Sequence, residues 1–231
     1  SLRRMDKLGT THITVNFHEI SGEYMLTIWG GTTSRTMHAH WMCHELGLDY
    51  SAKLIGPRTG ETHTKDFLQL NPKGKVPVLV DNDLVLSEGA AIITYLADTY
   101  AEPGTVIPVH GSHDRARYNQ WLSFIQMELD AHTLYVMRKH QDLSHLYGEA
   151  PTAIDAAIAG FNKQVAVAAE HLRERDYLVG NHFTGADLML TSILQWATNY
   201  GFELDSTLQE YANTQYQRPA YKAASELNKG G

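Results

Sequence analysis

The pattern of apolar and polar residues divides the chain into two regions. Between residues 25 and 100, short apolar runs alternate with segments whose apolar residues recur at helical spacing. Beyond residue 114 only the helical pattern recurs. Pro and Gly cluster between the two regions, in "AEPGTVIPVHGSHD" at 101–114, which is typical of a linker. We therefore predict an α/β region followed by an all-α region.

Four short runs in the first region predict strands. They are "MLTIW" (25–29), "DYSAKLI" (49–55), "VPVLV" (76–80) and "LVLS" (84–87). The last two flank "DND", whose Asp and Asn residues favour a hairpin turn, so we expect this pair to run antiparallel.

The segments that follow the strands predict helices. The first begins in "GGTTSRT", where Ser34 is the expected N-cap, and ends near Gly47. The second, at 62–72, is short and stops at its proline, and the third, at 88–100, carries an apolar stripe. The order βαβαββα predicts a small mixed sheet with helices on both faces.

The second region predicts helices alone, at 115–140, 150–175, 184–201 and 218–228. We expect the following division: an extension of unknown role at 1–24, an α/β domain at 25–101, a linker at 102–113 and an α-helical domain at 114–231.

Composition predicts a soluble globular protein. Hydrophobic residues make up 43% of the 231 residues, and the formal net charge of −7 offers no broad basic surface, so we expect no nucleic-acid partner. No apolar run approaches the roughly 20 residues that span a bilayer, and we expect neither a membrane segment nor a signal peptide. The single cysteine, Cys43, excludes an internal disulfide and favours a reducing compartment, by default the cytoplasm.

Pro77 and Glu88 stand at two positions suited to a ligand. Proline lacks an amide hydrogen, so at the mouth of a strand it leaves the backbone of Val76 available to pair with an extended peptide. The alternative is an ordinary edge-strand proline. Glu88 begins a helix, where an acid commonly complements the helix dipole but could also bind a ligand ammonium beside the free amides of that helix.

Four motifs together resemble the cytosolic glutathione transferases, of the bacterial type with a Ser/Thr loop in place of a cysteine. They are "NPKGKVPVL", "LVLSEGAAIITYLAD", "YLVGNHFTGADLML" and "RPAYKAA", and the resemblance covers residues 25 to about 228. It implies a thioredoxin-like N-terminal domain, an α-helical C-terminal domain, glutathione as cosubstrate and a homodimer.

The resemblance also implies roles for individual residues. Pro77 matches the cis proline of the family, and the backbone of Val76 would pair with the cysteinyl part of glutathione. Lys75 and His63 would lie near the glycyl carboxylate. Glu88 would bind the γ-glutamyl end. The next residue is usually serine in the family, and here it is Gly89. The serine hydroxyl is lost but the backbone amide remains, so we expect glutathione binding to be weakened but not removed. The implied glutathione-binding residues are His63, Lys75, Val76, Pro77, Glu88 and Gly89.

The catalytic group is expected in the loop after the first strand. Thr32, Thr33 and Ser34 all carry hydroxyls, which can donate a hydrogen bond to the glutathione sulfur. We predict Ser34 first and Thr33 second. Helix N-capping alone also explains Ser34, and both roles can coexist because the helix dipole favours an anion there.

Other candidates have structural explanations. Cys43 is expected to pack in the core. His40 and His44, four residues apart, could form half of a zinc site, but no further ligands are implied and we expect no metal. Thr184 and Asp187 have the spacing of a capping box.

The predicted reaction is attack of the glutathione thiolate on a hydrophobic, electrophilic small molecule. The bulky residues of the second region that could line its pocket are Tyr118, Trp121, Met127, Tyr135 and Met137, and we expect most of them in the core or at a subunit contact. The alternatives are glutathione-dependent disulfide or peroxide reduction, isomerisation or ether cleavage at the same site, and a non-catalytic binding protein of the same fold.

Overall fold

The computed structural model describes residues 26–230, so the predicted extension at 1–24 lies outside the described part of the chain. A four-stranded mixed sheet opens the fold, in the order β2-β1-β3-β4. β1 pairs parallel with β2, and β3 pairs antiparallel with both β1 and β4, which confirms the predicted hairpin. The strands are β1 (Thr27–Trp29), β2 (Ser51–Lys53), β3 (Val78–Asp81) and β4 (Leu84–Ser87).

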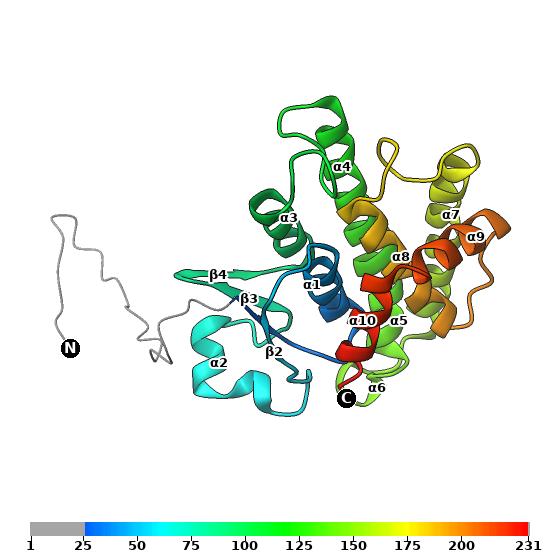
Figure 1. Cartoon of the computed structure of the whole chain (residues 1–231). Helices are drawn as coiled ribbons and strands as arrows, with labels where there is room; N and C mark the ends of the chain where they lie inside the picture. Colours follow the sequence, from blue (N-terminus) through cyan, green and yellow to red (C-terminus); the bar gives the residue numbers. More distant parts are fainter. Residues whose placement is uncertain (1–25, 231) are drawn as a thin grey trace, which may run out of the picture.

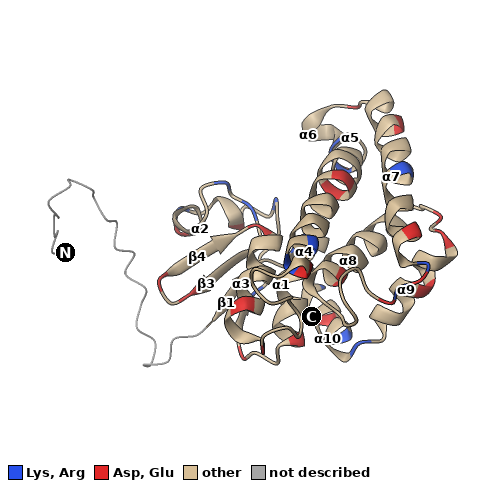
Figure 2. Ribbon diagram, turned by 90° about the horizontal axis from the view of Figure 1, so that it is seen from above, with Lys and Arg blue, Asp and Glu red and all other residues tan. Residues whose placement is uncertain are grey.

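Helices cover both faces of this sheet, as predicted. α1 and α3 lie on the face turned toward the helical region, and α2 lies on the opposite face (Figure 1). Figure 2 shows the same layers from above, with the strands between α2 and the α1–α3 pair. α2 contacts the sheet through Phe67, whose ring centroid lies 6.1 Å from that of Trp29. The helical segments are α1 (Ser34–Glu45), η1 (Glu61–His63), α2 (Lys65–Leu70) and α3 (Gly89–Tyr100).

In the described part of the second region, all regular secondary structure is helical. The predicted helix at 115–140 is interrupted, because its middle, η2, is wound as a π-helix. The region consists of α4 (His113–Phe124), η2 (Ile125–Leu134), α5 (Tyr135–His140), α6 (Ser144–Tyr147), α7 (Pro151–Leu172), α8 (Gly185–Asn199), α9 (Ser206–Tyr216) and α10 (Pro219–Asn228). In the part of the chain that the structure describes, no helix is both long and apolar enough to cross a membrane.

Two of these helices, α6 and α9, are not predicted by the sequence pattern. α9 is capped by Asp205, whose Oδ1 accepts a hydrogen bond from the Thr207 amide at 2.9 Å. Most of its residues are polar, and its buried face is narrow, with Leu208 and Tyr211 as its large apolar members. A helix with so few apolar positions gives little periodic signal.

The two regions share one continuous hydrophobic core. Ile28 and Trp41 of the first region belong to the same buried cluster as Phe161 and Leu190 of the second. α1 therefore lies between the sheet and the helical region, so its N-terminus opens where the two regions meet (Figure 1).

α8 forms the centre of the helical region, and its N-terminus confirms the predicted capping box. The Asp187 carboxylate accepts hydrogen bonds from the amide and the hydroxyl of Thr184, each at 2.8 Å. It also accepts from the Leu178 amide and the Tyr211 hydroxyl, each at 2.8 Å. All of its acceptor sites are used inside the fold, so this acid has a structural role.

Candidate active site

The loop after β1 leads directly into α1, and Thr33 is the residue that caps this helix. Its hydroxyl accepts a hydrogen bond from the Thr36 amide at 3.1 Å, and the Thr33 amide donates to the Thr36 hydroxyl at 3.2 Å. The prediction of Ser34 as N-cap is therefore wrong by one residue. Ser34 is the first residue of α1, and the capping hydroxyl belongs to the residue before it.

The last helix of the chain holds this loop in place through Asn228. Its backbone carbonyl accepts from the Thr32 amide at 2.6 Å, and its side-chain amide donates to the Thr33 carbonyl at 3.0 Å. The Thr36 hydroxyl donates to its side-chain oxygen at 2.6 Å. Sequence reasoning missed Asn228, because nothing in a local pattern links residues almost 200 positions apart.

Of the three hydroxyls of this loop, that of Ser34 both lines a cavity and is unpaired within the described chain, whereas Thr32 is exposed and lines neither cavity. The Ser34 side chain is half-buried, lines a cavity and makes no hydrogen bond to any residue that the structure describes. It stands in the first turn of α1, where unpaired amides and the helix dipole favour negative charge. Thr33 also lines the cavity, but its hydroxyl is engaged in the cap.

The entry to β3 lies next to this loop, and the Val76–Pro77 peptide bond is cis, as predicted. The backbone amide and carbonyl of Val76 pair with no described residue, although β3 is paired on both sides from Val78 onward. Gly30 allows the close approach of these segments: a Cβ there would lie 2.7 Å from the Val76 Cβ and 2.6 Å from the Thr36 Cγ2. The backbone of Val76 therefore offers one donor and one acceptor to a ligand.

Glu88 stands at the junction of β4 and α3 with a strained backbone. Its φ of +76° is unusual for a residue with a side chain, and such strain concentrates at functional sites. Its carboxylate forms an ion pair with Lys73, which also donates to the Ser87 hydroxyl at 2.9 Å. The hydrogen bond from Lys73 lowers the pKa of Glu88, so the group is an anion over the neutral range.

His38 belongs to α1, and its side chain faces the start of α3. Its side chain is buried, lines the cavity beside Glu88 and Gly89, and its Nε2 has no hydrogen-bond partner among the described residues. A Cβ at position 89 would lie 3.1 Å from its Nδ1. Burial lowers the pKa of His38 to about 3, which keeps the ring neutral. Sequence reasoning missed this residue, since a histidine within an amphipathic helix carries no distinguishing signal.

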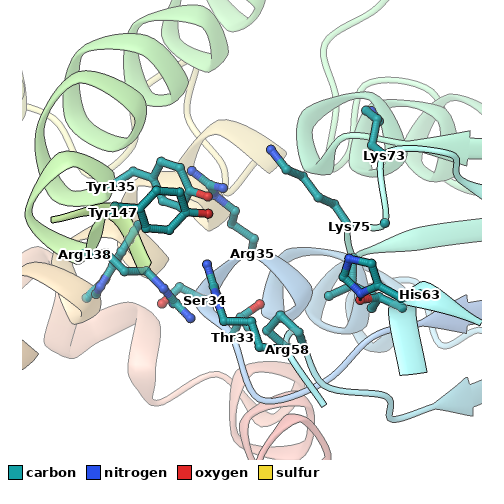
Figure 3. A pocket seen from close by; sticks show the side chains of 15 residues that line it. Thr33, Ser34, Arg35, Arg58, His63, Lys73, Lys75, Tyr135, Arg138 and Tyr147 are labelled. Carbon is teal, nitrogen blue, oxygen red and sulfur yellow. The ribbon is translucent and has the colours of Figure 1, made fainter. Parts of the chain in front are cut away.

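Two adjoining cavities connect these groups. One, of about 230 Å³, is lined by Thr33, Ser34 and Val76, and the other, of about 360 Å³, by Val76 and Glu88. Figure 3 shows the first cavity between Tyr135, Tyr147 and Arg138 of the helical region and Lys73, Lys75 and His63 of the α/β region, with Ser34 between them. The predicted site residues His63, Lys75, Val76, Pro77, Glu88 and Gly89 all line one or both cavities.

Comparison with known proteins identifies the family. Residues 25–98 match the family model for the glutathione S-transferase N-terminal domain, and residues 124–219 match that for the C-terminal domain. Glutathione S-transferase GST-4.5 of Xanthomonas campestris pv. campestris is 33% identical over 153 residues, which are 60% of this chain and 67% of the relative. GstA of Escherichia coli O157:H7, also a glutathione S-transferase, is 31% identical over 191 residues, 80% of this chain and 88% of the relative. The chain belongs to the glutathione transferase family.

A solved structure agrees with this fold. The glutathione transferase URE2P8 of Phanerochaete chrysosporium, solved with oxidised glutathione, superposes with a TM-score of 0.81 at 21% identity, over 90% of this chain and 97% of that chain. At this identity the likeness concerns the fold, and the thioredoxin-like and all-helical halves that the sequence predicts are both present.

Most of the five bulky candidates for the acceptor pocket of this glutathione transferase line neither cavity, as expected. Tyr118 and Met137 are buried in the core, and Trp121 packs edge-on against Phe124. Of the five predicted residues, Tyr135 lines the cavity beside Ser34 and Met127 the cavity beside Glu88. The residues that the prediction missed on the wall of the Ser34 cavity include Arg58, Arg138, Tyr147 and Trp196.

The remaining candidates are committed to the fold. Cys43 is fully buried, and burial raises the pKa of its thiol to about 12, which makes it a poor nucleophile. Both ring nitrogens of His40 are occupied, with Nε2 2.8 Å from the Gly30 carbonyl and Nδ1 3.0 Å from the Tyr50 hydroxyl. Within residues 26–230 no three His, Cys, Asp or Glu side chains lie close enough to hold a metal ion.

Proposed function

We propose that this chain binds glutathione along the Val76–Pro77 edge and joins the glutathione thiolate to an electrophilic small molecule. The observation that carries the proposal is the Ser34 hydroxyl, which has no partner in the described structure and lines the same cavity as the unpaired backbone of Val76. An extended tripeptide can pair with that backbone as an added strand would. Its sulfur then lies beside the N-terminus of α1.

The charged ends of glutathione have matching groups. Lys75 and His63 are proposed to bind the glycyl carboxylate, and both side chains are exposed at the cavity wall. Glu88 is proposed to bind the γ-glutamyl ammonium, with the Gly89 amide donating to the adjacent carboxylate. The ammonium would share the Glu88 carboxylate with Lys73.

Ser34 is proposed to donate a hydrogen bond to the thiolate. An unperturbed thiol has a pKa near 8.5, so about a few percent is ionised at neutral pH. The hydroxyl and the dipole of α1 stabilise the thiolate, and each unit by which its pKa falls corresponds to about 1.4 kcal/mol. The thiolate attacks the electrophilic carbon, a C–S bond forms and the leaving group departs with its electron pair, so the nucleophile is glutathione itself.

A conjugation assay with 1-chloro-2,4-dinitrobenzene tests this assignment. Ser34→Ala should lower glutathione-dependent kcat/KM by about tenfold or more, the range expected when a hydrogen bond to a developing anion is removed. Ser123→Ala, at an exposed serine of α4, is the matched control and should leave turnover unchanged. Thr33→Val tests the second candidate. If neither Ser34→Ala nor Thr33→Val reduces turnover, neither residue supplies the catalytic hydroxyl.

Conjugation is favoured over disulfide exchange through the protein, because the chain's one cysteine, Cys43, is buried away from the cavity. A disulfide substrate assayed beside the aryl halide separates the two reactions, including exchange by glutathione alone. We also propose a homodimer in the cytoplasm, which light scattering and cell fractionation can test.

A further inference from the structure

The cavity beside Ser34 carries positive charge. Among the residues that the structure describes, no Asp or Glu lines it, although the whole chain has a formal net charge of −7. Acidic residues are instead spread over many other elements (Figure 2). A concave site lined by one sign of charge concentrates ligands of the opposite sign. The Lys and Arg residues that line it are Arg35, Arg58, Lys73, Lys75 and Arg138.

Three of these cations already have a partner or a proposed role. Arg35 donates two hydrogen bonds to the Asp130 carboxylate, at 3.0 and 2.5 Å. Lys73 is paired with Glu88, and Lys75 is proposed to bind the glycyl carboxylate of glutathione. Their charges are therefore balanced within the protein or by the cosubstrate.

The other two, Arg58 and Arg138, have no such balance. Neither side chain forms an ion pair or a hydrogen bond with any residue in the described range. Arg58 lies in the loop after β2, and Arg138 belongs to α5, so they approach the cavity from different regions of the fold. Figure 3 shows Arg138 with Tyr135 and Tyr147, and Arg58 reaching toward the same space, with Ser34 between them in this view.

We propose that the electrophilic acceptor is an anion, and that Arg58 and Arg138 bind its carboxylate or sulfonate group. This inference rests on the proposed function, since it concerns the second substrate of the same site. A guanidinium group binds such an anion through two parallel hydrogen bonds, and its charge is permanent. Tyr147 and Trp196, which line the same cavity, suit a planar aromatic body attached to the charged group.

A matched pair of aryl halides tests the inference on the full chain. 4-Chloro-3,5-dinitrobenzoate carries a carboxylate, and 1-chloro-2,4-dinitrobenzene does not. In both, the thiolate forms a C–S bond at the chlorinated carbon and chloride leaves, so the reaction is the same. The selectivity is the kcat/KM for the anionic acceptor divided by that for the neutral one, each corrected for the uncatalysed rate. We expect Arg138→Gln to lower it by about tenfold or more and Arg58→Gln by a smaller factor.

Salt provides a second measurement that needs no variant. Raising NaCl from about 0.01 M to 1 M shortens the screening length from roughly 30 Å to 3 Å, so the KM of the anionic acceptor should rise and that of the neutral one should stay nearly constant. Arg173→Gln is the matched control, because Arg173 is exposed, pairs with Glu170 and lies outside both cavities. It should leave the selectivity unchanged.

The outcomes separate the two proposals. Suppose that the neutral acceptor is turned over but Arg138→Gln and Arg58→Gln leave the selectivity unchanged. The two arginines then do not bind an anionic group of the acceptor, and the inference is wrong. If neither acceptor is turned over in the presence of glutathione, the proposed function fails and this inference fails with it. A selectivity that falls in both arginine variants and in salt establishes the anionic acceptor.

Discussion

The ring of His38 lies in the space that a side chain at position 89 would need, with its Nδ1 3.1 Å from where a Cβ on Gly89 would be. The resemblance to glutathione transferases implies a serine at this position, where this chain has glycine. Glycine at this position therefore leaves room for the buried ring, and a Cβ there would require His38 to shift by a few tenths of an ångström.

Gly89→Ser should weaken glutathione binding, although it restores the residue usual in the family. Packing an additional group against a buried ring commonly costs about 1–3 kcal/mol, whereas a typical hydrogen bond contributes about 0.5–1.5 kcal/mol net, so we expect the cost to dominate. Calorimetric titration and thermal unfolding measure the two effects. The double variant Gly89→Ser/His38→Ala, in which the ring is gone, should bind glutathione more tightly than Gly89→Ser alone. Tighter binding by the single variant, with unchanged stability, would contradict this explanation.

His38 should make folding sensitive to acid. Burial, together with the charge of Arg35, lowers its pKa to about 3, whereas in the unfolded chain it titrates near its ordinary value of 6.5. Between these two pH values the unfolded state binds more protons, so the free energy of unfolding decreases as the pH is lowered, by up to about 1.4 kcal/mol for each unit. Above pH 6.5 this contribution is fully present. Urea titrations of wild type and His38→Phe from pH 8 to pH 4 should show a shallower acid slope in the variant, and equal slopes would refute the assignment.

Asn228 should affect catalysis from the far end of the chain. Asn228→Ala removes its hydrogen bonds to the Thr33 carbonyl and from the Thr36 hydroxyl. We expect a loss of about 1–3 kcal/mol in the free energy of unfolding, and a lower kcat/KM because the loop that holds Ser34 loses its support. Asn213→Ala, at an exposed asparagine of α9, is the control. Full activity and stability in Asn228→Ala would show that the loop needs no such anchor.

Local signals account for much of what the sequence predicts here. The β3–β4 hairpin follows from "DND" between two apolar runs, the Thr184–Asp187 capping box from its spacing, and the cis bond at Pro77 from the family motif. In each of them, residues close in sequence determine the structure.

Groups that meet only in the folded chain could not be predicted in this way. Arg58 and Arg138 lie 80 positions apart and share a cavity because two regions of the chain pack together. The prediction of Ser34 as N-cap was one residue too late, and propensity does not resolve such a shift because Thr33 and Ser34 are both good caps. The sequence pattern did not show which bulky residues face the acceptor pocket, because such residues are equally suited to the core, where Tyr118 and Met137 are buried.

The ion pair between Arg35 and Asp130 should couple the two regions at the active site. It joins α1 to η2, and the Arg35 guanidinium also lies over the Tyr135 ring, 4.1 Å from its centroid. The Asp130 side chain is 10% exposed and that of Arg35 33%, so water screens the pair only in part. Arg35→Gln leaves a nearly buried carboxylate with a weaker partner, and we expect a loss of about 1–3 kcal/mol in the free energy of unfolding.

A double-mutant cycle isolates this coupling. Arg35→Gln/Asp130→Asn should be less destabilised than the sum of its two single variants, by about 1 kcal/mol or more, because no unpaired charge remains in the double variant. The single variants should also lower glutathione affinity, since Arg35 lines both cavities and holds the helical region against α1. A coupling energy near zero, with unchanged affinity, would mean that the shared hydrophobic core alone sets the relative position of the two regions.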